Sequence, residues 1–411
     1  MDLSYGRAYE QFRDEVHDFL VKRWLPLALQ VDAGELPRRD AHATLRSLAV
    51  ARGYLYRSVP RRYGGSEQEP DLLKAQIIRE QFDKVRAPTE VPGVGVSMVV
   101  PTLLECGTPW QRDLFIPPTL AGDYMWAQGY SEPGAGSDLA SVRTRGELVG
   151  NEWVINGQKT WSSLAHKAQF MFALVRTESA AERHAGLSYL LLDLRQPSVT
   201  IRPLRQITGD ADFCEVFFDN ARTPADWVVG ERGAGWTVSK ATLSHERGSF
   251  IGGASNSVML FDKLVELAGA TTLDDKPAIH HPVIRERLTR LEGYVASHRY
   301  SSYRQLSMVA HGQDPGISTL MNKLQASNIA QEVAAIAREI IGDAFMLTGS
   351  EDRRSAGPEK WINQYLGSLG MAIAGGTSNI QRNVIAERGL GLPRDSRAQT
   401  TASTPSSWRA P

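Results

Sequence analysis

The feature of this 411-residue chain that most constrains its fold is a change of hydrophobic periodicity, from helical spacing to strand-like runs and back. Apolar residues recur at helical spacing from Tyr9 to Trp24, and similar patterns return at 41–51 and 71–82. The runs FMFALVR, LSYLLLDL, VTIRPL and CEVFFD then follow at short intervals with turn residues between them, as in a compact β-barrel or sandwich. Beyond Gly235 the spacing is helical again. This order predicts an α+β protein with an N-terminal helical domain, a central β domain and a C-terminal helical bundle.

The same changes of pattern predict where the domains end. We expect the N-terminal helical domain over 1–122, the central β domain over 123–232 and the C-terminal helical bundle over 233–395. Residues 396–411 are small, polar and proline-containing, with only Trp408 to bury, so this segment is predicted to be a disordered tail. Because helices and strands are segregated along the chain, a doubly wound, nicotinamide-binding fold is disfavoured.

Two local signals predict turns and helix ends within these domains. Asn156–Gly157 lies between two strand-like segments in EWVINGQKTW and is a favoured pair for the two-residue turn of a β-hairpin. An apolar stripe from Leu320 to Ile340 fits one helix, and Gly342 is well placed to end it. We therefore expect a hairpin turn at 156–157 and a helix end at 342.

Composition excludes several classes of partner and site. The formal net charge is zero, so no basic surface is expected to bind nucleic acid. No apolar run approaches the roughly 20 residues that cross a bilayer, and MDLSYGRAYEQF lacks the features of a signal peptide, so we expect a cytoplasmic protein without a membrane partner. Cys106 and Cys214 lie far apart and are read as reduced packing residues. His280 and His281 are adjacent and lack a set of carboxylates, so no metal site is predicted.

The segment with the highest density of glycines and polar side chains is WAQGYSEPGAGSDLAS, from Trp126 to Ser141. Its glycines permit close approach of the backbone, and Ser131 and Ser137 offer hydroxyls, so the loop suits a planar ligand with polar edges; a plain surface loop is the alternative. Trp161 precedes two serines and suits the face of a flat heterocycle, whereas a core tryptophan is the alternative. Phosphate-loop, zinc-helix, nucleophile-elbow and dinucleotide-fingerprint motifs are absent from the sequence.

Four segments in order, GYSEPGAGSD, INGQKTWSS, HERG and GGTSNIQRNVIAERGLGLPRD, resemble the acyl-CoA dehydrogenase family of flavoproteins from about residue 10 to 395. The resemblance implies an FAD-dependent α,β-dehydrogenation of an acyl thioester, acyl-CoA or carrier-protein-bound, to the trans-2-enoyl thioester. It also implies a homodimer or homotetramer that passes electrons to an electron-transfer flavoprotein. The family match further implies which residues face each ligand. The residues matched to FAD contacts are Gln128, Tyr130, Ser131, Trp161, Ser163, Gly376, Thr377 and Asn379, and those matched to substrate contacts are Ser137 and Arg247.

The resemblance also implies where the catalytic base lies. Many family members carry a glutamate immediately before the glycine-threonine pair of the last segment, but this chain has Gly375 there. In a second arrangement the base comes from an earlier helix, and the matching text LSHERGSFIGG places Glu246 at that position. A solvated Glu-Arg ion pair is the alternative reading of Glu246 and Arg247. The register with the family pattern and the glycine at 375 imply Glu246 as the base. A carboxylate in an acyl-filled pocket is partly desolvated, which suits it to remove a weakly acidic α-proton.

One stretch departs from the family pattern. Where members often have Arg-x-x-Phe-Gly and then His-Gln in the region that reaches a neighbouring subunit's FAD, this chain has Thr271, Asp274, Asp275 and Pro282. Two alternatives to a self-sufficient dehydrogenase therefore stay open. The departing stretch favours one of them, a weakly active structural partner subunit in a hetero-oligomer with a paralogue. The other is a flavin oxidase or monooxygenase on the same fold, which the sequence separates poorly from a dehydrogenase.

Overall fold

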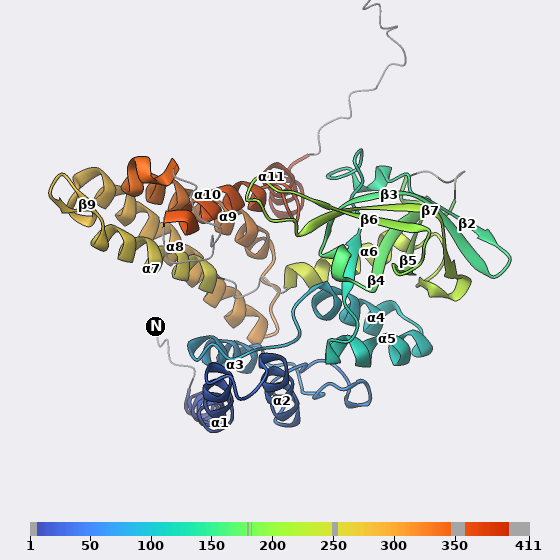
Figure 1. Cartoon of the computed structure of the whole chain (residues 1–411), viewed down its shortest axis with the longest axis horizontal. Helices are drawn as coiled ribbons and strands as arrows, with labels where there is room; N and C mark the ends of the chain where they lie inside the picture. Colours follow the sequence, from blue (N-terminus) through green and yellow to red (C-terminus); the bar gives the residue numbers. More distant parts are fainter. Residues whose placement is uncertain (1–5, 179–180, 182, 249–253, 347–357, 394–411) are drawn as a thin grey trace, which may run out of the picture.

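The computed structural model describes residues 6–178, 181, 183–248, 254–346 and 358–393. Figure 1 shows three parts, with the N-terminal helices at the bottom, a β-sheet on the right and a helical bundle on the left. The predicted α+β class with helical, β and helical parts is confirmed. The boundaries at 122 and 232 stay proposals. The predicted tail at 396–411 lies outside the described residues.

The N-terminal part is built from helices with clear sequence signals at their ends. Asp71 caps α3 by accepting a 2.9 Å hydrogen bond from the Lys74 N–H. Thr108 and Gln111 form a capping box at the start of α5, which ends at Gly122 with φ of 86°. The helices are α1 (Arg7–Asp32), α2 (Arg38–Ala51), α3 (Leu72–Lys84), α4 (Val100–Cys106) and α5 (Pro109–Ala121), with a 3-10 turn at Arg61–Tyr63 and a π-helical turn at Gly95–Val99.

The central part is one mixed sheet with strand order β6-β7-β3-β2-β4-β5-β8, with β1 paired to β4. Its strands are β1 (Trp126–Gly129), β2 (Arg145–Val149), β3 (Glu152–Ser163), β4 (Phe170–Arg176), β5 (Leu187–Asp193), β6 (Val199–Leu204), β7 (Phe213–Pro224) and β8 (Val228–Val229). On β4, Phe170 and Phe172 join the core shared with the N-terminal helices, whereas Met171 and Ala173 join a core on the other face of the sheet. Both faces of β4 are buried, which explains its unbroken apolar run.

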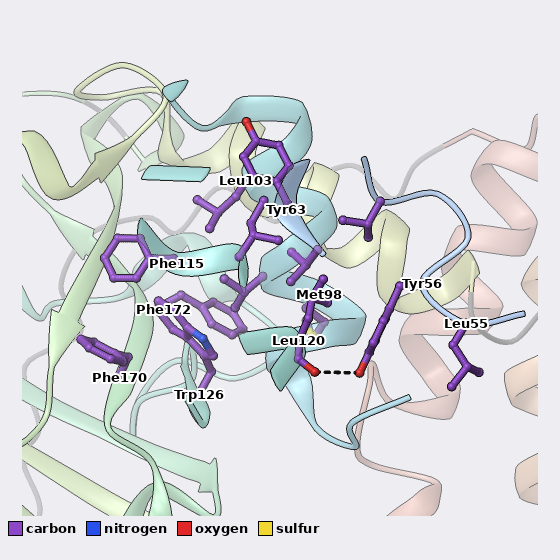
Figure 2. Close-up of a cluster of buried hydrophobic side chains, with 14 of the residues drawn as sticks. Leu55, Tyr56, Tyr63, Met98, Leu103, Phe115, Leu120, Trp126, Phe170 and Phe172 are labelled. Carbon is purple, nitrogen blue, oxygen red and sulfur yellow. Dashed lines mark hydrogen bonds between the residues drawn. The ribbon is translucent and has the colours of Figure 1, made fainter. Parts of the chain in front are cut away.

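Aromatic side chains fasten the N-terminal helices to the sheet (Figure 2). The Phe115 ring on α5 packs edge-on against Trp126 at 5.4 Å and Phe170 at 5.7 Å between centroids. Within the helical part, the buried Tyr56 hydroxyl donates to the Leu120 carbonyl at 2.9 Å. The helices therefore form one core with the sheet rather than a separate globule.

The hairpin turn predicted at Asn156–Gly157 is wrong, because both residues lie inside the continuous strand β3. The turn between β2 and β3 lies at 150–151, where Gly150 has φ of 64°. Gly157, with φ of 149°, occupies a register irregularity between β3 and β7. A Cβ there would lie 2.5 Å from the Thr144 hydroxyl, so the glycine permits close strand approach and does not make a turn.

The C-terminal part is the predicted helical bundle. The stripe from Leu320 to Ile340 forms α9, and Gly342, with φ of 62°, follows its last residue as predicted. Within the described residues the helices are α6 (Gly235–Gly248), α7 (Ser255–Ala270), α8 (Pro282–Ala310), α9 (Ile317–Ile341), α10 (Pro358–Met371) and α11 (Ser378–Val384), with a two-stranded hairpin at β9 (Thr272–Leu273) and β10 (Lys276–Pro277). Among the helices of the described residues, none is both long and apolar enough to span a membrane.

A buried histidine in this bundle predicts acid sensitivity. His298 on α8 is 1% exposed, and its Nδ1 lies 3.1 Å from the Ser257 hydroxyl on α7. Burial lowers the pKa of His298 below its ordinary value. As pH falls below about 6.5, the unfolded chain binds a proton that the native state resists, so stability decreases. We expect His298→Gln to weaken the fall of the urea midpoint between pH 7.5 and 5.5. Equal pH dependence in His298→Gln and the unmodified protein would contradict this.

Candidate active site

The first predicted ligand residues begin on β1, which pairs in parallel with β4 and holds Gln128 opposite Phe172. Tyr130 is buried edge-on against the Phe172 ring, with 5.6 Å between centroids. The Ser131 carbonyl accepts a 2.9 Å hydrogen bond from the Thr160 N–H on β3. Beyond it the loop opens to solvent, and a Cβ placed at Gly134 or Gly136 would meet nothing within 4 Å. The Ser131 loop is thus anchored to the sheet at its start and exposed to solvent at its glycines.

A buried ion pair anchors the Ser131 loop to the sheet. The Lys159 ammonium on β3, with a fully buried side chain, lies 2.8 Å from the Glu132 carboxylate, whose side chain is 8% exposed. Lys159 also donates to the carbonyls of Leu174 at 2.7 Å and Tyr130 at 3.2 Å. Glu132 in turn accepts from the N–H groups of Arg143 at 2.6 Å and Thr144 at 2.9 Å. The pair ties the loop to β3 and β4.

Both members of the pair are ionised near neutral pH. Burial opposes ionisation of Glu132, but the Lys159 charge and the two backbone N–H groups outweigh it and hold the pKa of Glu132 below its ordinary value. Burial lowers the pKa of Lys159 to about 8, against the opposing effect of the Glu132 charge. Sequence reasoning missed both residues. The available signals were a lysine inside a strand-like segment and a glutamate in the motif from Trp126 to Ser141, but they lie 27 positions apart.

Trp161 is exposed, not a core residue. Trp161 lies two residues after Lys159 on β3, and its backbone φ is 60°. Its side chain is 60% exposed, and the indole makes an edge-on contact with the Phe213 ring at 5.9 Å between centroids. Ser162 is buried behind it, and its hydroxyl has no hydrogen-bond partner among the described residues. Ser163 is half-buried and pairs with Phe213. An exposed indole beside the Ser131 loop suits a flat heteroaromatic ligand such as an isoalloxazine.

The remaining predicted FAD residues lie at the start of α11 on the bundle. Gly375 and Gly376 have φ of 62° and 91°, and the Thr377 hydroxyl caps α11 by accepting from the Ile380 N–H at 3.2 Å. Lys323 on α9, which sequence reasoning missed, donates to the Gly376 carbonyl at 2.7 Å and the Ala372 carbonyl at 3.3 Å. Asn379 is exposed. The two glycines therefore allow a tight backbone turn, and the Lys323 ammonium stabilises it through the two carbonyls.

Glu246, the predicted base, lies in the last turns of α6. The side chains of Glu246 and Arg247 lie outside the described ones. The helix that carries them, α6, packs against β5 and α4. Its first residue, Gly235, touches the sheet so closely that a Cβ would lie 2.4 Å from the Ser188 backbone.

The structure brings the Ser131 loop and the Trp161 strand together through the Thr160–Ser131 hydrogen bond. The start of α11 lies on a different part, the bundle, and the exposed Ser137 lies on the open edge of the loop. A cavity of about 630 Å³ lies beside α3, and one of about 420 Å³ lies between α8 and α9, but neither is lined by a predicted site residue.

The segment that departs from the family pattern forms the β9–β10 hairpin. Asp274 and Asp275 make its turn with φ of 48° and 61°, as a two-residue turn of type I′ requires. The Asp274 side chain is 92% exposed, and its carboxylate lies 4.0 Å from the His281 ring. The hairpin therefore presents carboxylates, which repel phosphate groups.

Comparison with known proteins gives a consistent assignment along the chain. Residues 7–123 match the acyl-CoA dehydrogenase N-terminal domain, residues 127–221 its middle domain and residues 233–390 its C-terminal domain. The acyl-CoA dehydrogenase IpdE1 of Mycobacterium tuberculosis is 45% identical over 319 residues, covering 77% of this chain and 80% of that relative.

Solved structures agree on the fold. The Tcur3481-Tcur3483 steroid ACAD has a TM-score of 0.75 at 26% identity, covering 96% of this chain and 100% of the other. The ChsE4-ChsE5 complex of Mycobacterium tuberculosis has a TM-score of 0.75 at 25% identity, with the same coverage.

Proposed function

The chain belongs to the acyl-CoA dehydrogenase family, and from this premise we propose that Glu246 is the base that removes the α-proton of its acyl-CoA substrate. As a family member it is an FAD-dependent oxidoreductase that dehydrogenates acyl-CoA. The observation that carries the proposal is the pair of residues at the two positions where the family places its base. Gly375 has no side chain, and Glu246 supplies a carboxylate on α6.

In the proposed reaction the acyl thioester loses a proton from Cα and a hydride from Cβ. Glu246 takes the α-proton, and the electrons of that C–H bond form the Cα=Cβ double bond of the trans-2-enoyl thioester. FAD, when bound, supplies the acceptor for the β-hydrogen, which leaves as hydride. The chain's own contribution is to place the carboxylate and to exclude water from it, because a desolvated carboxylate is a stronger base.

We assign the cofactor contacts to two surfaces. Gln128, Tyr130 and Ser131, with Trp161 and Ser163, would flank the isoalloxazine on the sheet; the anchored Ser131 loop and the exposed indole support this. Gly376, Thr377 and Asn379 would meet FAD at the bundle, where the positive φ of Gly376 allows close approach. Ser137 and Arg247 would contact the thioester arm. A carrier-protein thioester in place of acyl-CoA belongs to the same proposal, as do transfer of electrons to an electron-transfer flavoprotein and assembly as a homodimer or homotetramer.

Anaerobic mixing of the purified yellow protein with acyl thioesters tests the proposal. The panel should include straight-chain, branched and steroid-derived acyl-CoA, because one similar structure is named a steroid ACAD, and one carrier-protein thioester. We expect at least one acyl-CoA to bleach the flavin and to yield the 2-enoyl thioester by mass spectrometry. Hydrogen peroxide released with the same substrate in air at the rate of turnover would instead favour the oxidase alternative. Flavin that no thioester bleaches would contradict a dehydrogenase acting alone.

The second candidate is a partner subunit that supports a paralogue's active site. The carboxylate-bearing β9–β10 hairpin favours it, since this segment lies where other members reach a neighbour's FAD. The ChsE4-ChsE5 complex is, by its name, an assembly of two proteins. Flavin content per chain separates the candidates. One FAD per chain in the isolated protein supports a homo-oligomer, whereas substoichiometric FAD that rises on co-expression with a paralogue supports the partner subunit.

A further inference from the structure

Two contacts, one helical turn apart, join the helix that carries Glu246 to the N-terminal part. The inner contact joins the hydroxyls of Thr242 on α6 and Thr102 on α4, 2.9 Å apart. The outer contact joins the His245 ring to the Glu105 carboxylate at 2.9 Å. Each pair is separated by three residues on both helices, so the contacts form a two-rung ladder between α4 and α6.

The inner rung is closed to water. Thr242 is fully buried, and Thr102 and Tyr189 are each 1% exposed. The Thr242 hydroxyl also lies 3.0 Å from the Val238 carbonyl and 3.5 Å from the Tyr189 hydroxyl on β5. Burial raises the pKa of Tyr189 well above its ordinary value, so this neighbour is a neutral phenol. The Thr242 hydroxyl thus joins α6 to a helix of the N-terminal part and a strand of the sheet.

The position of the ladder links it to the base. Glu246 follows His245 directly and lies four residues, about one helical turn, after Thr242 on α6. Gly235 fixes the other end of α6 against the β5 backbone. The helix is therefore held at its start and near its end, which leaves little freedom for rotation or sliding at residue 246.

We propose that Thr242 and His245 are positioning residues, which set the rotation of α6 and thereby aim Glu246 at the substrate. This inference rests on the proposed role of Glu246 as the base. A displacement of about 1 Å in a reacting group can slow a reaction by roughly 100-fold, so a loosened helix end has a measurable kinetic effect. Neither residue needs to touch the substrate or FAD.

Thr242→Val tests the inner rung, because valine keeps the shape and removes only the hydroxyl. Thr102 is not left without a partner, since its hydroxyl also lies 2.7 Å from the Met98 carbonyl. We expect flavin reduction in a single turnover to slow by about 10-fold or more, with FAD content, visible spectrum and KM unchanged. Thr242→Ser should restore the rate, because serine returns the hydroxyl. The isotope effect of α-deuterated substrate on flavin reduction should rise in Thr242→Val.

Thr223→Val is the matched control. Thr223 on β7 is 1% exposed, and its hydroxyl donates to the Leu191 carbonyl at 2.7 Å. The Thr223→Val variant therefore loses a buried hydroxyl of the sheet and leaves the α4–α6 contacts in place. Should Thr242→Val fail to fold, His245→Ala removes the half-exposed outer rung and is expected to slow reduction in the same way. A wild-type rate in either α6 variant, or an equal loss in Thr223→Val, overturns the positioning role.

Glu246→Gln, measured in parallel, separates the two proposals. If it stops flavin reduction while Thr242→Val is silent, only the positioning role fails. If it reduces flavin normally, the base assignment fails and the positioning role falls with it.

Discussion

Replacing Glu246 by glutamine is expected to slow anaerobic flavin reduction by roughly 10²- to 10⁴-fold, the usual contribution of a positioned general base. The amide keeps the size of the side chain but does not accept the α-proton, so binding of acyl-CoA and FAD should persist. Stopped-flow mixing with the best substrate of the panel measures the rate, and the visible spectrum measures FAD. The loss should fall on kcat more than on KM, because the interaction matters in the transition state.

A second variant asks whether the family's other base position faces the same carbon. Gly375→Glu in the Glu246→Gln background places a carboxylate just before Gly376 and Thr377. Gly375 has φ of 62°, so a side chain there is strained by roughly 1–2 kcal/mol, and we expect only partial recovery of the rate. Near-normal flavin reduction by Glu246→Gln alone would show that the base is another group.

The helical parts could be predicted from sequence because their signals are local. The stripe from Leu320 to Ile340 and the glycine at 342 define α9 without reference to any other segment. The turn prediction at Asn156–Gly157 failed because the same dipeptide also suits a strand irregularity. The structure uses Gly157 to let β3 approach Thr144, a contact between segments that no local pattern encodes.

The site shows the same division. Family motifs identified Ser131 and Trp161 as candidate ligand residues, but the ion pair beneath them joins residues 27 positions apart. The Thr102–Thr242 contact spans 140 positions and depends on how two helices pack. Such contacts require tertiary structure, because nothing in the sequence near either partner specifies the other. The exposure of Trp161 also accompanies a shift in the pairing of β3 with β7 between Lys159 and Ser162, which depends on the partner strand.

The second large effect is expected at the buried ion pair. Lys159→Met removes the ammonium and leaves the Glu132 carboxylate 8% exposed with only backbone N–H partners. Breaking a buried pair by removing one member destabilises proteins by about 3–5 kcal/mol, because an uncompensated charge stays inside. We expect a fall of that size in the free energy of unfolding from urea denaturation, together with faster loss of FAD as the Ser131 loop loosens.

Two further variants separate the uncompensated charge from lost packing. The double change Glu132→Gln/Lys159→Met has no buried charge, and the amide oxygen still accepts a backbone N–H, so it should recover a large part of the stability lost in Lys159→Met. Arg222→Met breaks the exposed Arg222–Glu152 pair, 2.7 Å apart on the same sheet with side chains 57% and 46% exposed, and should change stability by about 1 kcal/mol or less. If the double change is no more stable than Lys159→Met, the cost is packing of the lysine stem. If all three variants are as stable as the unmodified protein, the ion pair does not hold the Ser131 loop. The anchoring of this loop at the proposed flavin site must then come from the strand pairing alone.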